Sequence, residues 1–313
     1  MLQSRLLSAL VLIAVSLFII GLDLWFPIAA QPGVWLIPLY LFMTLGTAAE
    51  ASQLLARRWP VDVRSVLVHC CIASAIMLFP LWYSVVMSKS YPIGCPVGRA
   101  GWVLIGLLSG VGSSGLQSIW DFRKLPHSLS SAEFAAETER TTLRWLLSSF
   151  VITYVVGCLS FWFLVRMQGS SVSGMLHLIA LLAIIKFADT GAYFAGKAFG
   201  RHKLIPSISP GKTIEGLIGG MFASIVVAYF FLRVLLPMCG LPGGPFIWGP
   251  AFLGCLLTLV GLVGDLLESM VKRTVGAKDS GALLPGLGGV WDVTDSLLPT
   301  AIIGYLGIIA NLT

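Results

Sequence analysis

Nine runs of about 20 apolar residues follow one another along the chain, each long enough to cross a bilayer as a helix. They lie at residues 6–28, 33–55, 64–87, 100–120, 145–166, 173–196, 214–236, 247–270 and 290–312. The longest polar segment between them, residues 121–144, is too short to bury a core of its own. We therefore expect an all-α polytopic integral membrane protein with about nine transmembrane helices.

The low charge content supports this class, since only 11% of the residues are charged, against about 25% in soluble proteins. Cytoplasmic loops carry the excess of lysine and arginine, and with a cytoplasmic N-terminus fifteen of the 20 fall on that side. The net charge of +6 would then attract anionic headgroups or anionic substrates. No basic soluble module exists, which argues against a nucleic-acid partner. We expect N-terminal helices at residues 1–170 and a catalytic membrane region at 171–313, integrated in one domain.

Two stripes of polar residues with helical spacing occur where the eighth and ninth runs meet. The stripes comprise Asp265, Glu268, Ser269 and Lys272, then Asp292, Asp295 and Ser296. Ionisable residues at membrane depth mark functional sites by default, and Asp189 lies at a similar depth in the sixth run. Oxygen ligands of this kind favour a hard cation such as Mg²⁺, for which we predict Asp265 and Asp292 as ligands. The alternative is an ion-pair network that only ties helices together.

A second polar segment, residues 196–220, contains the sequence SPGKT. Ser209 followed by Pro210 predicts a helix that starts there, with Lys212 and Thr213 in its first turn. Such a helix start binds phosphate readily, although a basic anchor at the lipid surface is an equal alternative. A nucleotide P-loop is rejected, because Pro206 replaces the glycine that the motif requires. Metal ligands, a phosphate site and a basic rim together indicate phosphoryl or nucleotidyl transfer on a membrane-embedded substrate.

These residues resemble the phosphatidate cytidylyltransferase family, also called CDP-diacylglycerol synthase. The family signature is approximately S-x-x-K-R-x4-K-D-x-G-x2-hydrophobic-P-x-H-G-G-x-x-D-R-x-D. The matching residues are Ser269, Lys272, Arg273, Lys278, Asp279, Gly281, Leu284, Pro285, Gly288, Gly289, Asp292 and Asp295. The segment around Asp189 and SPGKT also looks like a conserved region of the family, so the resemblance covers about residues 180–300.

The resemblance implies a reaction in which CTP and phosphatidic acid give CDP-diacylglycerol and pyrophosphate during phospholipid biosynthesis. It implies Mg²⁺, alone or with a second cation, in a bacterial-type inner membrane with the active site facing the cytoplasm. The residues implied in catalysis are Asp265, Asp292, Lys278, Asp279 and Asp295, and those in substrate binding are Ser209, Lys212, Thr213, Glu215, Lys272, Arg273 and Asp189. Membrane lipids are the other partners, and a homodimer is compatible with the family.

Two positions depart from the signature. Leu287 replaces the family histidine, and Val293 replaces the arginine beside the metal-binding aspartate. Loss of two donors near a triphosphate weakens stabilisation of the charge in the transition state. The alternatives are therefore a degenerate or re-tuned paralogue that binds lipid or CTP, or a CTP-dependent lipid kinase. A transporter is disfavoured, because the acids lie near one face rather than at the midplane.

Overall fold

The structure is a computed structural model that describes residues 2–28, 31–89, 91–92, 94–126 and 128–313. Helices make up almost all of its regular secondary structure, which confirms the all-α polytopic class. Contacts between residues divide the chain into two compact units. The first comprises Met1–Ser160 and Thr274–Asp292, and the second comprises Phe161–Arg273 and Val293–Thr313.

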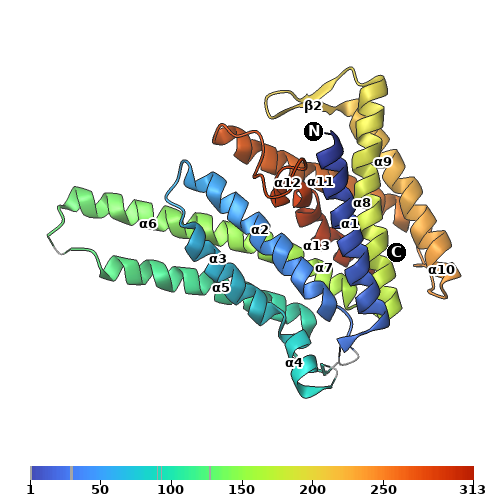
Figure 1. The fold of residues 1–313 in the computed structure, drawn as a ribbon, viewed down its shortest axis with the longest axis horizontal. Coiled ribbons are helices and arrows are strands. Elements are labelled where there is room, and N and C mark those ends of the chain that lie inside the picture. The colour runs from blue at the N-terminus through green and yellow to red at the C-terminus, as the bar shows by residue number, and fades with distance from the viewer. Residues whose placement is uncertain (1, 29–30, 90, 93, 127) are drawn as a thin grey trace. The chain divides into compact units, whose positions relative to one another are not determined.

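The first unit contains the N-terminal helices (Figure 1). Their bounds are α1 Leu2–Trp25, η2 Val34–Leu36, α2 Ile37–Ala56, α3 Val63–Met77, α4 Phe79–Met87, α5 Gly98–Arg123, α6 Ser131–Val151 and η3 Ile152–Gly157. Helix α6 starts at a capping box, in which Ser130 accepts from the N–H of Glu133 and the Glu133 side chain accepts from that of Ser130. About four turns of α6, residues 131–144, therefore lie in the polar segment that separates the fourth and fifth apolar runs.

The third apolar run forms two helices, α3 and α4, which are bent by 55° at Leu78. Pro80 explains the break, because proline has no N–H to donate and its ring excludes the carbonyl four residues earlier in a continuous helix. Leu78 and Pro80 are both buried, so the bend is part of the packed unit rather than a surface irregularity.

The second unit contains the C-terminal helices and a short hairpin (Figure 1). Their bounds are α7 Cys158–Arg166, α8 Ser171–Phe199, β1 Lys203–Ile205, β2 Ser209–Thr213, α9 Ile214–Tyr229, η4 Phe230–Leu235, α10 Leu236–Met238, α11 Gly249–Thr274, α12 Val290–Thr294 and α13 Leu297–Ile309. Helices α7 and α12 begin in the first unit and end in this one.

Helices α8 and α9 lie side by side along small residues (Figure 1). A Cβ atom added at Gly220 would lie 2.8 Å from the carbonyl oxygen of Ala188, and one at Gly216 would lie 2.9 Å from that of Ala192. These two glycines are therefore contacts between packed helices. Glycine at these positions lets the two backbones approach closely, as in other membrane helix pairs.

Seven helices among the described residues are long and apolar enough to span a membrane, and the α3–α4 pair raises this number to eight. They coincide with the second to ninth apolar runs. The first run is α1, whose part at Leu10–Trp25 forms a shorter apolar helix. The number nine and the side on which the N-terminus lies stay predictions.

The expected helix start at Ser209 is wrong. Residues Ser209–Thr213 form strand β2, which pairs antiparallel with β1 in the register Lys203 to Thr213 and Ile205 to Ser209. Pro210 falls in the irregular part of this register, where a residue without an N–H is tolerated. Helix α9 begins five residues later, with Thr213 as its N-cap.

We predict that Gly220→Ala lowers the thermal stability of the detergent-purified protein. The new methyl group would overpack the contact between α8 and α9 and lower the free energy of unfolding by about 1–3 kcal/mol. Gly112→Ala is the matched control, since it also lies in an apolar helix but has nothing within 4 Å of its Cβ position. The control should be neutral or slightly stabilising. Equal melting temperatures for the two variants would contradict the close α8–α9 packing.

Candidate active site

Three carboxylates from α11 and the start of the last apolar run lie together in the second unit. Asp265, Glu268 and Asp295 each offer an oxygen, and these oxygens lie within 4.8 Å of one another. Glu268 is buried, whereas Asp265 and Asp295 are half-buried. The predicted residues Asp265 and Asp295 are therefore neighbours, joined by a glutamate that the sequence placed on the same stripe. Three carboxylates so close repel one another unless cations lie near them.

Two lysines provide that positive charge. Lys212 Nζ on β2 lies 2.6 Å from Asp265 Oδ2, and Lys272 Nζ lies 2.7 Å from Glu268 Oε2 one turn along α11. Ser269 also donates to Asp265 Oδ1 at 3.4 Å. The helical stripe on α11 predicted from the sequence is therefore present. Ion pairs hold these side chains together, and a metal or a phosphate group would have to compete with them.

The second predicted stripe is interrupted, because α12 ends at Thr294 and α13 begins at Leu297. Pro299 accounts for the break, since proline has no N–H to donate to the carbonyl of Asp295, the acceptor four residues earlier in a continuous helix. That carbonyl instead lies against Gly264 of α11, where any side chain would collide with it. Asp295 and Ser296 form the two-residue turn between α12 and α13, inside the single apolar span Val290–Ile309, and Asp295 reaches the cluster from this turn.

Another ion pair lies on α8. Lys186 Nζ is 3.5 Å from Asp189 Oδ2, one turn along the same helix, and it donates to Ser296 Oγ at 3.3 Å. Asp189 is exposed, with 55% of its side chain accessible. Lys186 therefore links α8 to the turn that carries Asp295, while Asp189 serves as the counter-ion of this lysine.

The β1–β2 hairpin carries the remaining predicted phosphate-binding residues. Glu215 accepts from His202 Nδ1 at 2.6 Å and from the backbone N–H groups of Arg201 and His202, so it closes the base of the hairpin. Thr213 is buried and accepts from the N–H of Gly216 at 3.0 Å. At the other end, Arg273 donates to the carbonyl of Ile208 at 3.4 Å. These contacts fix the strand on which Lys212 lies.

Asp292 lies in the first unit, within a network that involves the α11–α12 loop (residues 275–289). Its Oδ2 accepts from the N–H of Ser280 at 3.1 Å, from Ser280 Oγ at 2.9 Å and from the N–H of Gly289 at 2.7 Å. Ser280 Oγ also lies 3.0 Å from Glu50 Oε2 of α2, so its single hydroxyl hydrogen is shared between the two carboxylates. Sequence reasoning missed Glu50, because nothing local links it to a loop 230 residues away.

Three further residues of the signature lie in this loop or beside it. Lys278 and Asp279 are exposed, and Leu287 lies in a turn in which its N–H donates to the carbonyl of Leu284. The side chains of Lys278 and Asp279 are therefore accessible to a soluble substrate. Ser209 is half-buried at the start of β2.

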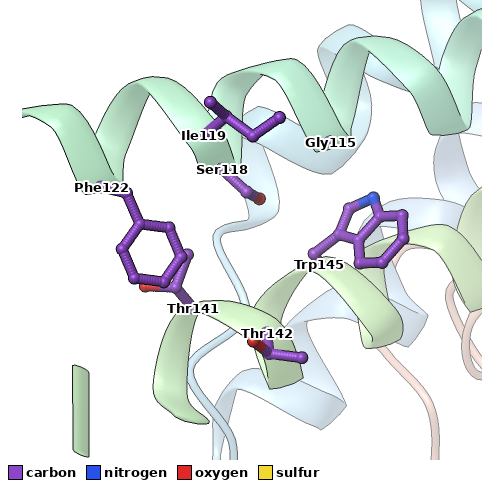
Figure 2. A pocket seen from close by; sticks show the side chains of 7 residues that line it. All are labelled: Gly115, Ser118, Ile119, Phe122, Thr141, Thr142 and Trp145. Carbon is purple, nitrogen blue, oxygen red and sulfur yellow. The ribbon is translucent and has the colours of Figure 1, made fainter. Parts of the chain in front are cut away.

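A pocket of about 180 Å³ lies between α5 and α6 (Figure 2). Its lining residues are Gly115, Ser118, Ile119, Phe122, Thr141, Thr142 and Trp145. Figure 2 shows Phe122 and Trp145 on opposite sides of the space, and no ionisable residue lines it. The pocket contains none of the predicted site residues and offers no group for phosphate chemistry.

Three carboxylates, lysines within ion-pair distance of two of them and apolar spanning helices define a membrane protein with a charged site. The family model that matches this chain is described as the cytidylyltransferase family, and the match covers residues 3–309. The chain therefore belongs to the cytidylyltransferase family, which confirms the resemblance drawn from the signature.

Individual relatives agree with this assignment. A phosphatidate cytidylyltransferase of Haemophilus influenzae is 44% identical over 124 residues, which are 40% of this chain and 42% of the relative. One of Brucella suis is 42% identical over 140 residues, 45% of this chain and 49% of the relative. The protein YnbB of Escherichia coli, which has no assigned activity, is 35% identical over 157 residues, 50% of this chain and 49% of the relative. Each match thus spans less than half of the relative's length.

We predict that Thr213→Ala lowers the free energy of unfolding by about 1 kcal/mol, because it removes the N-cap of α9. Thr213→Ser should retain most of the stability, since its hydroxyl can accept the same hydrogen bond from Gly216. Melting temperatures in one detergent would compare the three proteins. A fully stable Thr213→Ala variant would show that the cap contributes nothing.

Proposed function

We propose that the protein is a CTP:phosphatidate cytidylyltransferase that makes CDP-diacylglycerol and pyrophosphate. The observation that carries this proposal is the cluster of Asp265, Glu268 and Asp295 with Lys212 and Lys272, in a chain of the cytidylyltransferase family. The names of the relatives support the choice of phosphatidate as the lipid. The exposed positions of Lys278 and Asp279 are consistent with a nucleotide that arrives from water.

Phosphatidate is already ionised at neutral pH, so its phosphate oxygen can attack the α-phosphorus of CTP without a strong general base. The bond from that phosphorus to the β-phosphate oxygen breaks, and pyrophosphate leaves. The residues of the protein then have to position two anions and balance their charge. Lys212 is suited to this task, because it lies on a strand and can exchange Asp265 for a phosphate oxygen. We assign Lys272, Arg273 and Lys278 to the triphosphate.

The donor set fits Mg²⁺, since all of its candidate ligands are carboxylate oxygens. In the second unit, Asp265 would hold the ion, with Glu268 and Asp295 beside it. In the first unit, Asp292 stays the other proposed ligand. When bound, the ion would neutralise charge that develops on the transferring phosphoryl group and on the leaving pyrophosphate. This number of carboxylates is also compatible with a second cation, which the family resemblance allows.

The relatives are bacterial and the helices are apolar, which supports a bacterial integral membrane protein. We place it in the inner membrane with the site toward the cytoplasm, where CTP is available. The distribution of lysine and arginine along the sequence supports this orientation.

The first activity prediction concerns the carboxylates. Detergent-purified protein with Mg²⁺, CTP and phosphatidic acid should form CDP-diacylglycerol, and Asp265→Asn or Asp292→Asn should reduce the rate by at least about 100-fold, because each removes a charged ligand. Glu137→Gln is a suitable control, since it removes an acid from a surface pair with Arg140. A folded wild type that forms no product with any divalent metal would overturn the proposal, and transfer of the γ-phosphate to lipid would indicate a kinase.

The second activity prediction concerns the two departures from the signature. We expect the double variant Leu287→His with Val293→Arg to raise turnover, because it restores an imidazole and a guanidinium that can stabilise negative charge. Each single variant serves as a control for nonspecific effects on folding. An unchanged or lower rate in the double variant would indicate that this site has been re-tuned around Leu287 and Val293.

A further inference from the structure

We propose that Glu50 is a positioning residue for nucleotidyl transfer, whose buried carboxylate fixes the α11–α12 loop and through it holds Asp292. The inference rests on the proposed function, in which Asp292 is a metal ligand. Glu50 lies on α2, far from the signature in sequence, and it is 5% exposed. All of the residues involved belong to the first unit.

The carboxylate of Glu50 accepts hydrogen bonds from a residue within the loop and from a residue just after it. Its Oε2 accepts from Ser280 Oγ at 3.0 Å and from the N–H of Trp291 at 2.9 Å. Among the described residues, no donor lies within hydrogen-bonding distance of the buried Oε1. A buried carboxylate costs free energy, and hydrogen bonds to it are stronger than those between neutral groups. Glu50 is therefore placed to hold Ser280 and Trp291 at a fixed separation.

Two glycines of the signature are shaped around this carboxylate. A Cβ atom added at Gly281 would collide with Glu50 Oε1, and one added at Gly289 would collide with Glu50 Oε2 and Ser280 Oγ. One turn earlier on α2, Gly46 packs against Val290, where a Cβ atom would lie 2.9 Å from Val290 Cγ2. This face of α2 therefore packs closely against residues within the loop and against Val290, which directly follows it.

The same contacts determine where Asp292 lies. Trp291, whose N–H donates to Glu50, directly precedes Asp292, and Ser280 Oγ lies 3.0 Å from Glu50 Oε2 and 2.9 Å from Asp292 Oδ2. The N–H of Asp292 donates to Ser280 Oγ at 3.3 Å. Loss of the Glu50 acceptor would release Ser280 and the peptide group before Asp292 together. Partners that orient a metal ligand in this way affect metal affinity although they do not touch the metal.

The test uses the full-length protein with Glu50→Ala and Glu50→Gln. Glu50→Ala should raise the Mg²⁺ concentration for half-maximal CDP-diacylglycerol formation by about 10-fold or more. Glu50→Gln should remain close to wild type, because its amide oxygen can accept the same two hydrogen bonds. Asp23→Ala is the matched control, since Asp23 is also a buried acid of the first unit and accepts from the N–H of Gly33 at 2.8 Å. It should lower stability without changing the Mg²⁺ requirement.

A second measurement does not depend on activity. Lys278 is exposed at the start of the loop, so trypsin should cleave after it faster in Glu50→Ala than in wild type, Glu50→Gln or Asp23→Ala. Gly281→Ala should also accelerate cleavage in the wild-type background, but should add little to Glu50→Ala, because the colliding carboxylate is then absent. Additive effects, or equal cleavage in Glu50→Ala and Asp23→Ala, would overturn the proposal. If the wild type formed no CDP-diacylglycerol, the proposed function would fail while cleavage still decided the role of Glu50.

Discussion

The main constraint on this protein is the cost of placing carboxylates among apolar helices, where each needs a cation or several donors nearby. The second unit meets it with ion pairs, Lys212 to Asp265 and Lys272 to Glu268. The first unit meets it with hydrogen bonds, from Ser280 and backbone N–H groups. The helices can therefore bring acids together among apolar side chains, which the proposed phosphate chemistry requires.

The spanning helices and the stripe on α11 could be predicted from the sequence, because both depend on local spacing. The hairpin could not, since Ser209 and Pro210 carry a valid helix-start signal and the strand forms only by pairing with residues near Lys203. Thr213 is also a preferred N-cap, so the sequence contains two possible start sites for this helix, Ser209 and Thr213. The pairing of β2 with β1 leaves Thr213 as the N-cap. The turn before α13 could have been predicted from Pro299, because proline interrupts a continuous helix. Glu50 gave no local signal, because its partners are about 230 residues away in the sequence.

The structure also changes how the signature is understood. Its aspartates and lysines carry the proposed chemistry, but Gly281 and Gly289 serve a different purpose, because they leave room for a carboxylate from α2. The family assignment covers nearly the whole chain, and this contact gives one physical reason why the N-terminal helices belong with the C-terminal motif. The departures at Leu287 and Val293 leave these glycines unchanged.

The ion pairs of Asp265 and Glu268 depend on different parts of the fold. Glu268 and Lys272 are one turn apart, so their pair exists as soon as α11 is helical. Asp265 obtains its lysine from a separate hairpin, which has to dock first. Until the hairpin docks, α11 therefore carries an aspartate without this counter-ion, which costs free energy beside lipid. Docking of the hairpin removes that cost and couples assembly of the site to completion of the fold.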